Sequence, residues 1–522
     1  MIPSKMYKIS GKVLIAFALI LSLSACSQDT SVNGINSEYF PDKSFRVSSP
    51  EEQGMDSEKL FQMLNYLRDE GKEIHNIKVI KNGYKVLDTS FFPYSDRNLH
   101  AVNSVTKSVT SALLGIALEE RKIMSIEDKV LGYFPDRKVK NIDENKNSMT
   151  LKNLLMMTGG FDWIENGSYS EADSWMKMRD SDDPIGYILD KPVTTKPGEK
   201  FYYNTGGSHI LSAILQGSTG EKVVDYAEKK LFTEMGIEEK QWQQDKTGVS
   251  IGGAALFLKP EDMAKFGYLY LRKGKWKGKQ LVPEAWISES TSKQIDTPDG
   301  LAGKYGYGYH WWMNNFGGYS ARGFGGQYIF VVPEYDLVVA ITSGLVGYDF
   351  FLPEGLVKNF IVDSISEKKS LPANKTAYDK LREIEKELSQ APKPSKPIKS
   401  SGFAKEISGN TYVMDDKSEM SFAFEKDNEC TVDFIWEGSA DKYIVGLDGV
   451  WRINHNLKSG SMDAGNSNAA KGEWIDEKQF KFSIKPLNDM AEVSFEVGFD
   501  GDAITVDVSD MWGSMTQKGK LK

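Results

Sequence analysis

The chain has 522 residues, 40% of them hydrophobic, so it can bury a large core and is long enough for more than one domain. Its formal net charge of -9 gives no reason to expect a nucleic-acid partner. Only two cysteines occur, Cys26 and Cys430, and no His-x-x-x-His pair is present, which argues against a thiol nucleophile and a zinc hydrolase. We therefore expect neither a metal nor an organic cofactor.

Residues 1–25 are predicted to be a lipoprotein signal peptide. Three lysines precede an apolar run at 13–21, which is too short to span a bilayer, and Leu-Ser-Ala then leads to Cys26. This ending resembles a bacterial lipoprotein cleavage site and predicts lipidation of Cys26, export and attachment to the cell membrane. The alternative is an ordinary signal peptide with a chance cysteine. Residues 26–45, rich in Ser, Asn and Asp, are expected to form a flexible tether.

The most informative stretch is 103–114, which predicts a buried helix with a nucleophile in its first turn. Asn103 is expected to be the N-cap, and apolar residues recur at helical spacing to about Glu120. Ser104 and Lys107, three residues apart, then share a face. A lysine with a pKa lowered by desolvation can activate a serine hydroxyl. Ser-x-x-Lys recurs at Ser174, Ser290, Ser366 and Ser439, but only the copy at Ser104 opens a long apolar helix.

Further helices and strands are expected between residues 46 and 370, which we assign to one domain. An Asn-Gly pair predicts a hairpin with strands at 77–80 and 84–87, and a Pro-Glu-Tyr-Asp turn joins a second pair of strands. Between these two pairs of strands, an apolar segment that begins at Leu151 is predicted to be a helix that ends at the glycines at 159 and 160. The second hairpin is expected at 327–332 and 337–342, and helices within 151–160, at 210–216 and at 354–366.

Together these motifs resemble the serine β-lactamase and penicillin-binding superfamily, in particular its class C-like branch of esterases, D-amino-acid peptidases and 6-aminohexanoate-dimer hydrolases. The resemblance covers about residues 48–365. It rests on Ser104 and Lys107, the Leu-Met-Met-Thr-Gly-Gly segment at 155–160, a Pro-Gly to Tyr-Asn segment at 197–204, and the glycines at 323–326. It implies an α/β (α+β) fold in which helices flank an antiparallel sheet and a helical lobe packs beside it.

The family's second catalytic element is Tyr-x-Asn, whose tyrosine takes part in proton transfer. Two registers are possible: the letters favour Tyr202, whereas the spacing to the flanking motifs favours Tyr203. We follow the spacing, which makes Tyr203 catalytic and assigns Asn204 and Thr205 to substrate binding. A lysine cation such as that of Lys107 would stabilise a tyrosine phenolate.

The third element should contribute to the oxyanion hole beside the nucleophile. Lys246-Thr247-Gly248 has the expected letters but follows a polar segment, and we reject it together with the overlapping Gly-x-Ser-x-Gly text. Gly323-Phe324-Gly325-Gly326 leads directly into the last hairpin. A backbone amide near Gly325 or Gly326, with that of Ser104, is predicted to bind the oxyanion; the alternative is a simple tight turn.

The sequence departs from the family where a cation would hold a substrate carboxylate. Gly323 carries no charge, and strand alternation points its neighbour Arg322 to the other face. We therefore expect an acyl-enzyme serine hydrolase that acts on a small ester, amide or short peptide. A penicillin-binding D,D-peptidase or β-lactamase is the alternative, and a non-catalytic binding or sensor protein is a further one.

The C-terminal part is predicted to be a separate domain. Residues 371–400 contain a charged helix and a Pro-rich linker, and residues 401–522 contain about eight short alternating runs. This pattern favours an all-β barrel or sandwich. It carries no catalytic constellation, so we expect a structural accessory or a ligand-binding module.

Overall fold

The computed structural model describes residues 39–165, 172–298, 306–395, 402–436, 439–455, 457 and 467–522. The predicted signal peptide, Cys26 and most of the predicted tether lie outside these residues. None of the helices in the described part combines the length and the apolar character that crossing a membrane requires.

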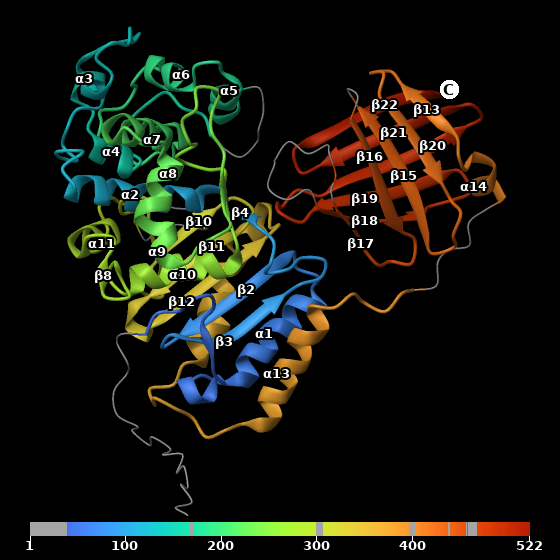
Figure 1. Ribbon diagram of the computed structural model, residues 1–522, viewed down its shortest axis with the longest axis horizontal. Coiled ribbons are helices and arrows are strands. Elements are labelled where there is room, and N and C mark those ends of the chain that lie inside the picture. Colours follow the sequence, from blue (N-terminus) through green and yellow to red (C-terminus); the bar gives the residue numbers. More distant parts are fainter. Residues whose placement is uncertain are drawn as a thin grey trace, which may run out of the picture. The chain divides into compact units, whose positions relative to one another are not determined.

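A seven-stranded sheet with strand order β1-β3-β2-β12-β11-β10-β9 forms the centre of the N-terminal domain (Figure 1). All neighbours are antiparallel except β1 and β3. The predicted Asn-Gly hairpin is present, with Asn82 and Gly83 at φ 53° and 74°, as its tight turn requires. The strands are β1 (Arg46–Val47), β2 (Ile74–Lys81), β3 (Tyr84–Ser90), β9 (Trp312–Met313), β10 (Tyr319–Gly323), β11 (Gln327–Val332) and β12 (Leu337–Ser343).

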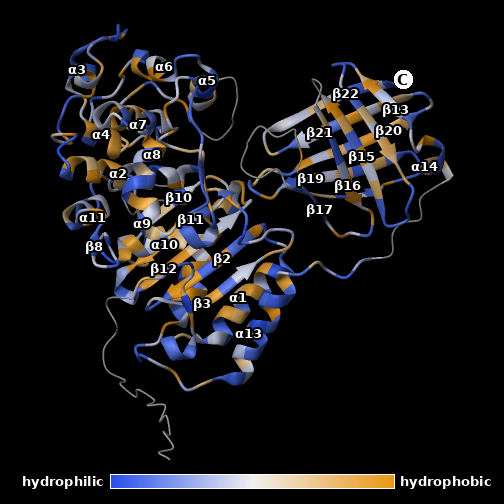
Figure 2. Cartoon of the chain, in the orientation of Figure 1, coloured by the Kyte–Doolittle hydropathy of each residue, from blue (hydrophilic) through white to orange (hydrophobic). Residues whose placement is uncertain are grey.

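Both faces of this sheet are buried, which explains its nearly continuous apolar strands. On β12, Val338 and Ala340 join one hydrophobic core, whereas Val339 and Ile341 join the other, as the period of two along a strand dictates. Helices α1 (Ser57–Asp69) and α13 (Lys375–Leu388) cover the second core, and α10 (Pro260–Leu271) covers the first. Figure 2 shows hydrophobic residues concentrated around β11, β12 and α10.

A helical lobe packs beside the sheet and contains the long helix predicted from residue 103 onward. Helix α2 contacts α7 within the first core, and α7 is longer than the predicted helix at 210–216. The region predicted as a helix at 354–366 consists of three short helical segments. The helices here are α2 (Thr106–Glu119), α4 (Leu151–Leu155), α5 (Ser174–Asp180), α6 (Pro184–Asp190), α7 (Thr205–Thr219), α8 (Val223–Ala227) and α11 (Glu284–Ser290). Helix α12 (Leu352–Leu356) packs instead with the second core, which contains Leu356.

The C-terminal domain is a closed nine-stranded barrel, which confirms the barrel among the two predicted architectures. Antiparallel neighbours run from β16 through β15, β14, β13 and β22 to β18, and a parallel pairing of Gly446 with Lys471 joins β16 to β18 and closes the ring. Aromatic side chains fill its core, among them Phe422, Phe480 and Phe499. The barrel strands are β13 (Thr411–Met414), β14 (Glu419–Ala423), β15 (Glu429–Trp436), β16 (Ser439–Gly446), β18 (Asn468–Trp474), β19 (Gln479–Pro486), β20 (Val493–Asp500), β21 (Ala503–Asp510) and β22 (Gly513–Leu521), with β17 (Arg452–Asn454) paired outside β18.

Candidate active site

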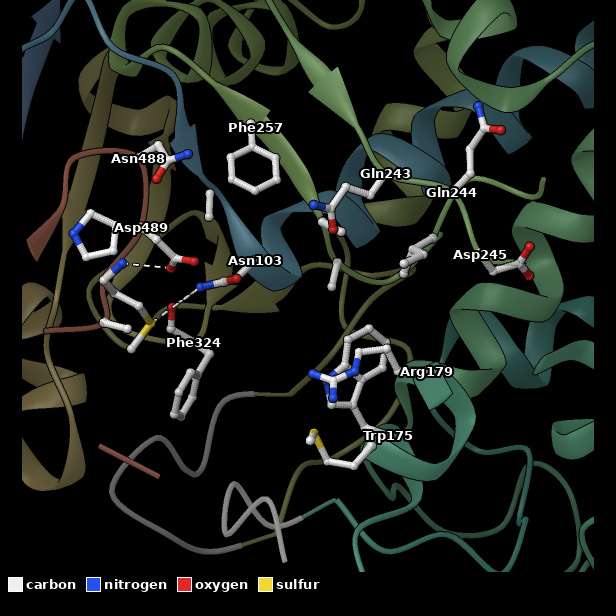
Figure 3. A pocket seen from close by; sticks show the side chains of 18 of the residues that line it. Asn103, Trp175, Arg179, Gln243, Gln244, Asp245, Phe257, Phe324, Asn488 and Asp489 are labelled. Atoms are coloured by element: carbon white, nitrogen blue, oxygen red, sulfur yellow. Dashed lines mark hydrogen bonds between the residues drawn. The ribbon is translucent and has the colours of Figure 1, made fainter. Parts of the chain in front are cut away.

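Ser104 lies in a single 3-10 turn, Asn103–Val105, that leads into α2. The prediction that Asn103 caps this helix is wrong, because Asn103 has a positive φ of 49° inside the turn. Its side chain instead donates a hydrogen bond to the carbonyl oxygen of Phe324, 2.8 Å away (Figure 3). Asn103 therefore ties the turn that carries Ser104 to the glycine-rich turn after β10.

Lys107 is the residue that makes Ser104 stand out from the other serines. Its Nζ lies 2.8 Å from Ser104 Oγ, 2.9 Å from Thr205 Oγ1 and 2.8 Å from the carbonyl oxygen of Gly253. The side chain is 1% exposed. Burial lowers the pKa of Lys107 to about 8, and the carboxylate of Glu165 opposes this shift. An amine with such a pKa is neutral in a useful fraction of molecules near neutral pH and can accept a proton.

The two candidate tyrosines differ in their surroundings. Tyr202 is 47% exposed, whereas Tyr203 lines the same cleft as Ser104. The amine of Lys107 lies 4.8 Å from the centre of the Tyr203 ring, and Trp312 stacks against that ring at 6.1 Å. The structure thus brings Tyr203, the residue favoured by spacing, to the Ser104–Lys107 pair.

Asn204 and Thr205 are both predicted to bind substrate, but only Thr205 lines the cleft that contains Ser104. The side chain of Asn204 is 7% exposed and caps α7 by accepting a hydrogen bond from the Gly207 amide at 3.0 Å. Thr205 lines the cleft and contacts Lys107. Its hydroxyl donates to Glu165 Oε1 at 2.5 Å, and its amide donates to Glu165 Oε2 at 2.8 Å.

The glycine-rich turn after β10 lies against the nucleophile turn. A Cβ atom on Gly323 would lie 2.3 Å from the carbonyl oxygen of Val102 and 3.1 Å from the Ser104 amide nitrogen, so the close approach requires glycine here. Gly323 and Phe324 line the cleft. Gly325 and Gly326 form the following turn with φ 78° and 81°. This arrangement brings backbone from the third predicted element beside Ser104, and the choice of the second oxyanion amide stays a prediction.

Arg322, which strand alternation was expected to point away, instead lines the cleft that contains Ser104. Its guanidinium is buried and donates to Glu354 at 2.8 Å and to Ser320 Oγ at 3.0 Å. Its charge is therefore paired with a carboxylate of the protein. Arg322 does not replace the missing family cation as a free charge.

Two pockets adjoin at the nucleophile turn. One, with a volume of about 670 Å³, contains Ser104, Tyr203 and Thr205, and Met511 and Trp512 of the β21–β22 turn also line it. The other, of about 680 Å³, is lined by a mixture of apolar and polar side chains (Figure 3). Both pockets share Asn103, Trp175, Ala254, Phe324 and Trp512. A substrate with groups on both sides of its reacting carbonyl could thus occupy both.

Lys246, part of the rejected Lys-Thr-Gly text, donates instead to Asp182 at 2.7 Å and to the Asp180 carbonyl. Sequence reasoning missed two residues at the site, Gly253 and Glu165. Gly253 acts through a backbone carbonyl, which no side-chain pattern reveals, and Glu165 follows Trp163 without a motif. Within the described ranges, no group of three His, Cys, Asp or Glu side chains is arranged to hold a metal ion.

One protein family and several known proteins are similar to this chain. Residues 75–352 match the family model described as Beta-lactamase. A 6-aminohexanoate-dimer hydrolase from Paenarthrobacter ureafaciens is 22% identical over 281 residues, which cover 51% of this chain and 71% of that protein. A Bacillus anthracis structure provisionally described as a 6-aminohexanoate-dimer hydrolase aligns with a TM-score of 0.52 at 21% identity, covering 63% of this chain and 89% of its own. An octameric penicillin-binding protein homologue from Pyrococcus abyssi aligns over 88% of this chain and 99% of its own, with a TM-score of 0.48 and 17% identity.

Proposed function

Because the chain belongs to the beta-lactamase family and is a serine hydrolase, we propose that it cleaves an ester or amide through an acyl-enzyme formed on Ser104. The observation that carries this proposal is the 2.8 Å contact between Ser104 Oγ and the buried Lys107 amine. A serine hydroxyl attacks a carbonyl only when a neighbouring base takes its proton. The position of the Lys107 amine at hydrogen-bonding distance from Ser104 Oγ supports this role for it.

The proposed reaction proceeds in two halves. Lys107 takes the hydroxyl proton as Ser104 Oγ attacks the carbonyl carbon. The oxyanion that forms accepts hydrogen bonds from backbone N–H groups of Ser104 and of the turn after Gly323. Lys107 and Tyr203 then deliver the proton to the leaving oxygen or nitrogen as its bond to carbon breaks. A water molecule attacks the acyl-enzyme, gives its proton back along this path, and releases the acid and Ser104.

The charges in the cleft favour a substrate without a carboxylate beside the reacting carbonyl. Glu165 and Asp173 both line the cleft, whereas the guanidinium of Arg322 is already paired with Glu354. Among the described side chains that line this cleft, an acidic substrate would therefore meet two carboxylates and a guanidinium that is already paired. This supports a neutral ester or amide over a penicillin or cell-wall peptide ending in a carboxylate.

We test the proposal by incubating the wild-type protein with a fluorescent phosphonate and, separately, with a fluorescent penicillin, and measuring intact mass. Labelling by the phosphonate alone is expected. Labelling by both would favour the D,D-peptidase or β-lactamase alternative. Labelling by neither would favour a binding or sensor protein, because such a protein does not need a reactive serine.

We also propose that the protein is exported and held at the membrane by lipid on Cys26. The support is the sequence pattern alone: a short apolar run after lysines, ending in Leu-Ser-Ala-Cys. Such an anchor would place the hydrolase at the outer surface of the cell membrane or in the periplasm.

A further inference from the structure

The reaction described above does not use the carboxylate of Glu165. This carboxylate is nevertheless linked to Lys107 through a single side chain, that of Thr205. Its Oε1 accepts the hydroxyl of Thr205 at 2.5 Å, and Thr205 Oγ1 in turn lies 2.9 Å from Lys107 Nζ. Its other oxygen accepts the Thr205 amide at 2.8 Å and the indole N–H of Trp163 at 2.7 Å. Both carboxylate oxygens therefore have fixed donors.

These contacts determine the direction of the Thr205 hydrogen. A carboxylate accepts hydrogen bonds and donates none, so the single hydroxyl hydrogen of Thr205 points to Glu165. The lone pairs of Thr205 Oγ1 remain for Lys107. The carbonyl oxygen of Gly253, 2.8 Å from Lys107 Nζ, is likewise only an acceptor.

The neighbours of Lys107 Nζ determine the direction of its lone pair. A neutral amine has two hydrogens and one lone pair, and Lys107 Nζ has three polar neighbours. Two of these, Thr205 Oγ1 and Gly253 O, take the hydrogens. The lone pair is left facing the third neighbour, Ser104 Oγ, whose proton it must accept.

We propose that Glu165 is a positioning residue that aims the lone pair of Lys107 at Ser104 by fixing the hydroxyl of Thr205 as an acceptor. This inference rests on the proposed acyl-enzyme function and assigns it a further residue. Glu165 need not touch the substrate to act. Its effect should appear in the rate of serine acylation more than in substrate binding.

The substitution Glu165→Gln tests this because it keeps the shape but reverses the bonding. The amide and indole donors of Thr205 and Trp163 would hold the single Gln oxygen in place, so its NH2 group would face Thr205 Oγ1. The Thr205 hydrogen would then turn toward Lys107 and occupy its lone pair. We expect kcat for p-nitrophenyl acetate to fall by roughly 10²-fold, the scale of a general base contribution, with a much smaller change in KM.

The pH profile distinguishes positioning from a merely structural role. The Glu165 carboxylate raises the pKa of Lys107, so its removal should shift the acid limb of the remaining activity to lower pH. Glu199→Gln, an exposed carboxylate in the loop before Tyr203, is the matched control and should change neither rate nor profile. A Glu165→Gln enzyme with kcat within about twofold of wild type, or with an unmoved acid limb, would overturn the proposal.

Thr205 provides a second test that does not depend on Glu165→Gln folding well. Thr205→Val removes the bridging hydroxyl and should cost a similar factor in kcat, and Thr205→Ser should restore most of it. The double variant Glu165→Gln/Thr205→Val should be no slower than Thr205→Val alone, because Glu165 acts through Thr205. The inference would be contradicted if the two losses in kcat multiplied in the double variant, or if Thr205→Val and Thr205→Ser had equal rates. Phosphonate labelling of the wild-type protein distinguishes failure of this inference from failure of the proposed function. If the wild type is not labelled, the proposed acyl-enzyme function itself is wrong.

Discussion

The buried amine of Lys107 and the partly exposed hydroxyl of Ser104 lie 2.8 Å apart at the start of α2. Lys107 has no salt-bridge partner among the described residues within 4.0 Å, and the carboxylate of Glu165 is linked to it through Thr205. A lysine held in this way keeps a neutral form available, which is the property that the proposed mechanism requires.

The first prediction concerns pH. Only neutral Lys107 can take the Ser104 proton, and the neutral fraction grows as pH rises through the lysine pKa of about 8. We therefore expect kcat/KM for a neutral ester to rise with an acid limb near pH 8. Lys107→Arg, which stays charged at every relevant pH, should lose roughly 10²- to 10⁴-fold in rate, whereas Lys369→Arg in another Ser-x-x-Lys copy should not. A profile that stays flat from about pH 6 to about pH 9, on both sides of the expected lysine limb, would contradict Lys107 as the base.

The second prediction separates the two tyrosines. Tyr203→Phe removes a hydroxyl from the cleft and should slow turnover by roughly 10²- to 10⁴-fold. Tyr202→Phe is its matched control and should do little, because Tyr202 is 47% exposed. Since Phe keeps the ring, unfolding free energy should change by about 1 kcal/mol at most. Steady-state kinetics and thermal melts measure both; an inactive Tyr202→Phe would restore the literal Tyr-x-Asn match.

The sequence predicted the features that depend on a local pattern, but not those that depend on a contact between distant parts of the chain. The Asn82-Gly83 pair and the apolar runs beside it predicted the first hairpin of the sheet, because turn geometry and short apolar runs are local properties of the sequence. Chain spacing likewise selected Tyr203, which lies beside Lys107.

Residues whose role depends on distant partners were missed or misplaced. Asn103 looks like a helix cap but reaches across to Phe324, 221 residues away in sequence. Arg322 sits in the cleft because Glu354, on α12, holds its guanidinium. Glu165 matters only through Thr205. No local pattern encodes these pairings, so they required the structure.

A third prediction tests the close approach of β10 to the nucleophile turn. Gly323→Ala would place a Cβ atom 2.3 Å from the Val102 carbonyl and must push the strand end and the Ser104 turn apart. Displacing a reacting group by about 1 Å can cost about 10²-fold, so phosphonylation of Ser104 by the probe should slow by at least about tenfold. Gly217→Ala, where an added Cβ meets nothing within 4 Å, is the control. Equal labelling rates would mean that the turn has room to adjust.

The fourth prediction concerns the anchor. Cys26→Ser should move the protein from the membrane fraction to the soluble exported fraction, because serine cannot carry a thioether-linked lipid. Fractionation followed by immunoblotting measures this, with Cys430→Ser, a buried barrel residue, as control. Continued sedimentation of Cys26→Ser with membranes would show that lipid on Cys26 is not what holds the protein there.

The central claim is that Ser104 is the nucleophile, and intact mass spectrometry after phosphonate treatment tests it most directly. Ser366→Ala, another Ser-x-x-Lys serine that binds the Lys368 amide away from the cleft, serves as the matched control. We predict that wild type and Ser366→Ala each gain one phosphonate, and that Ser104→Ala, with an unchanged melting temperature, gains none. A folded Ser104→Ala protein that still takes up one phosphonate would contradict the account.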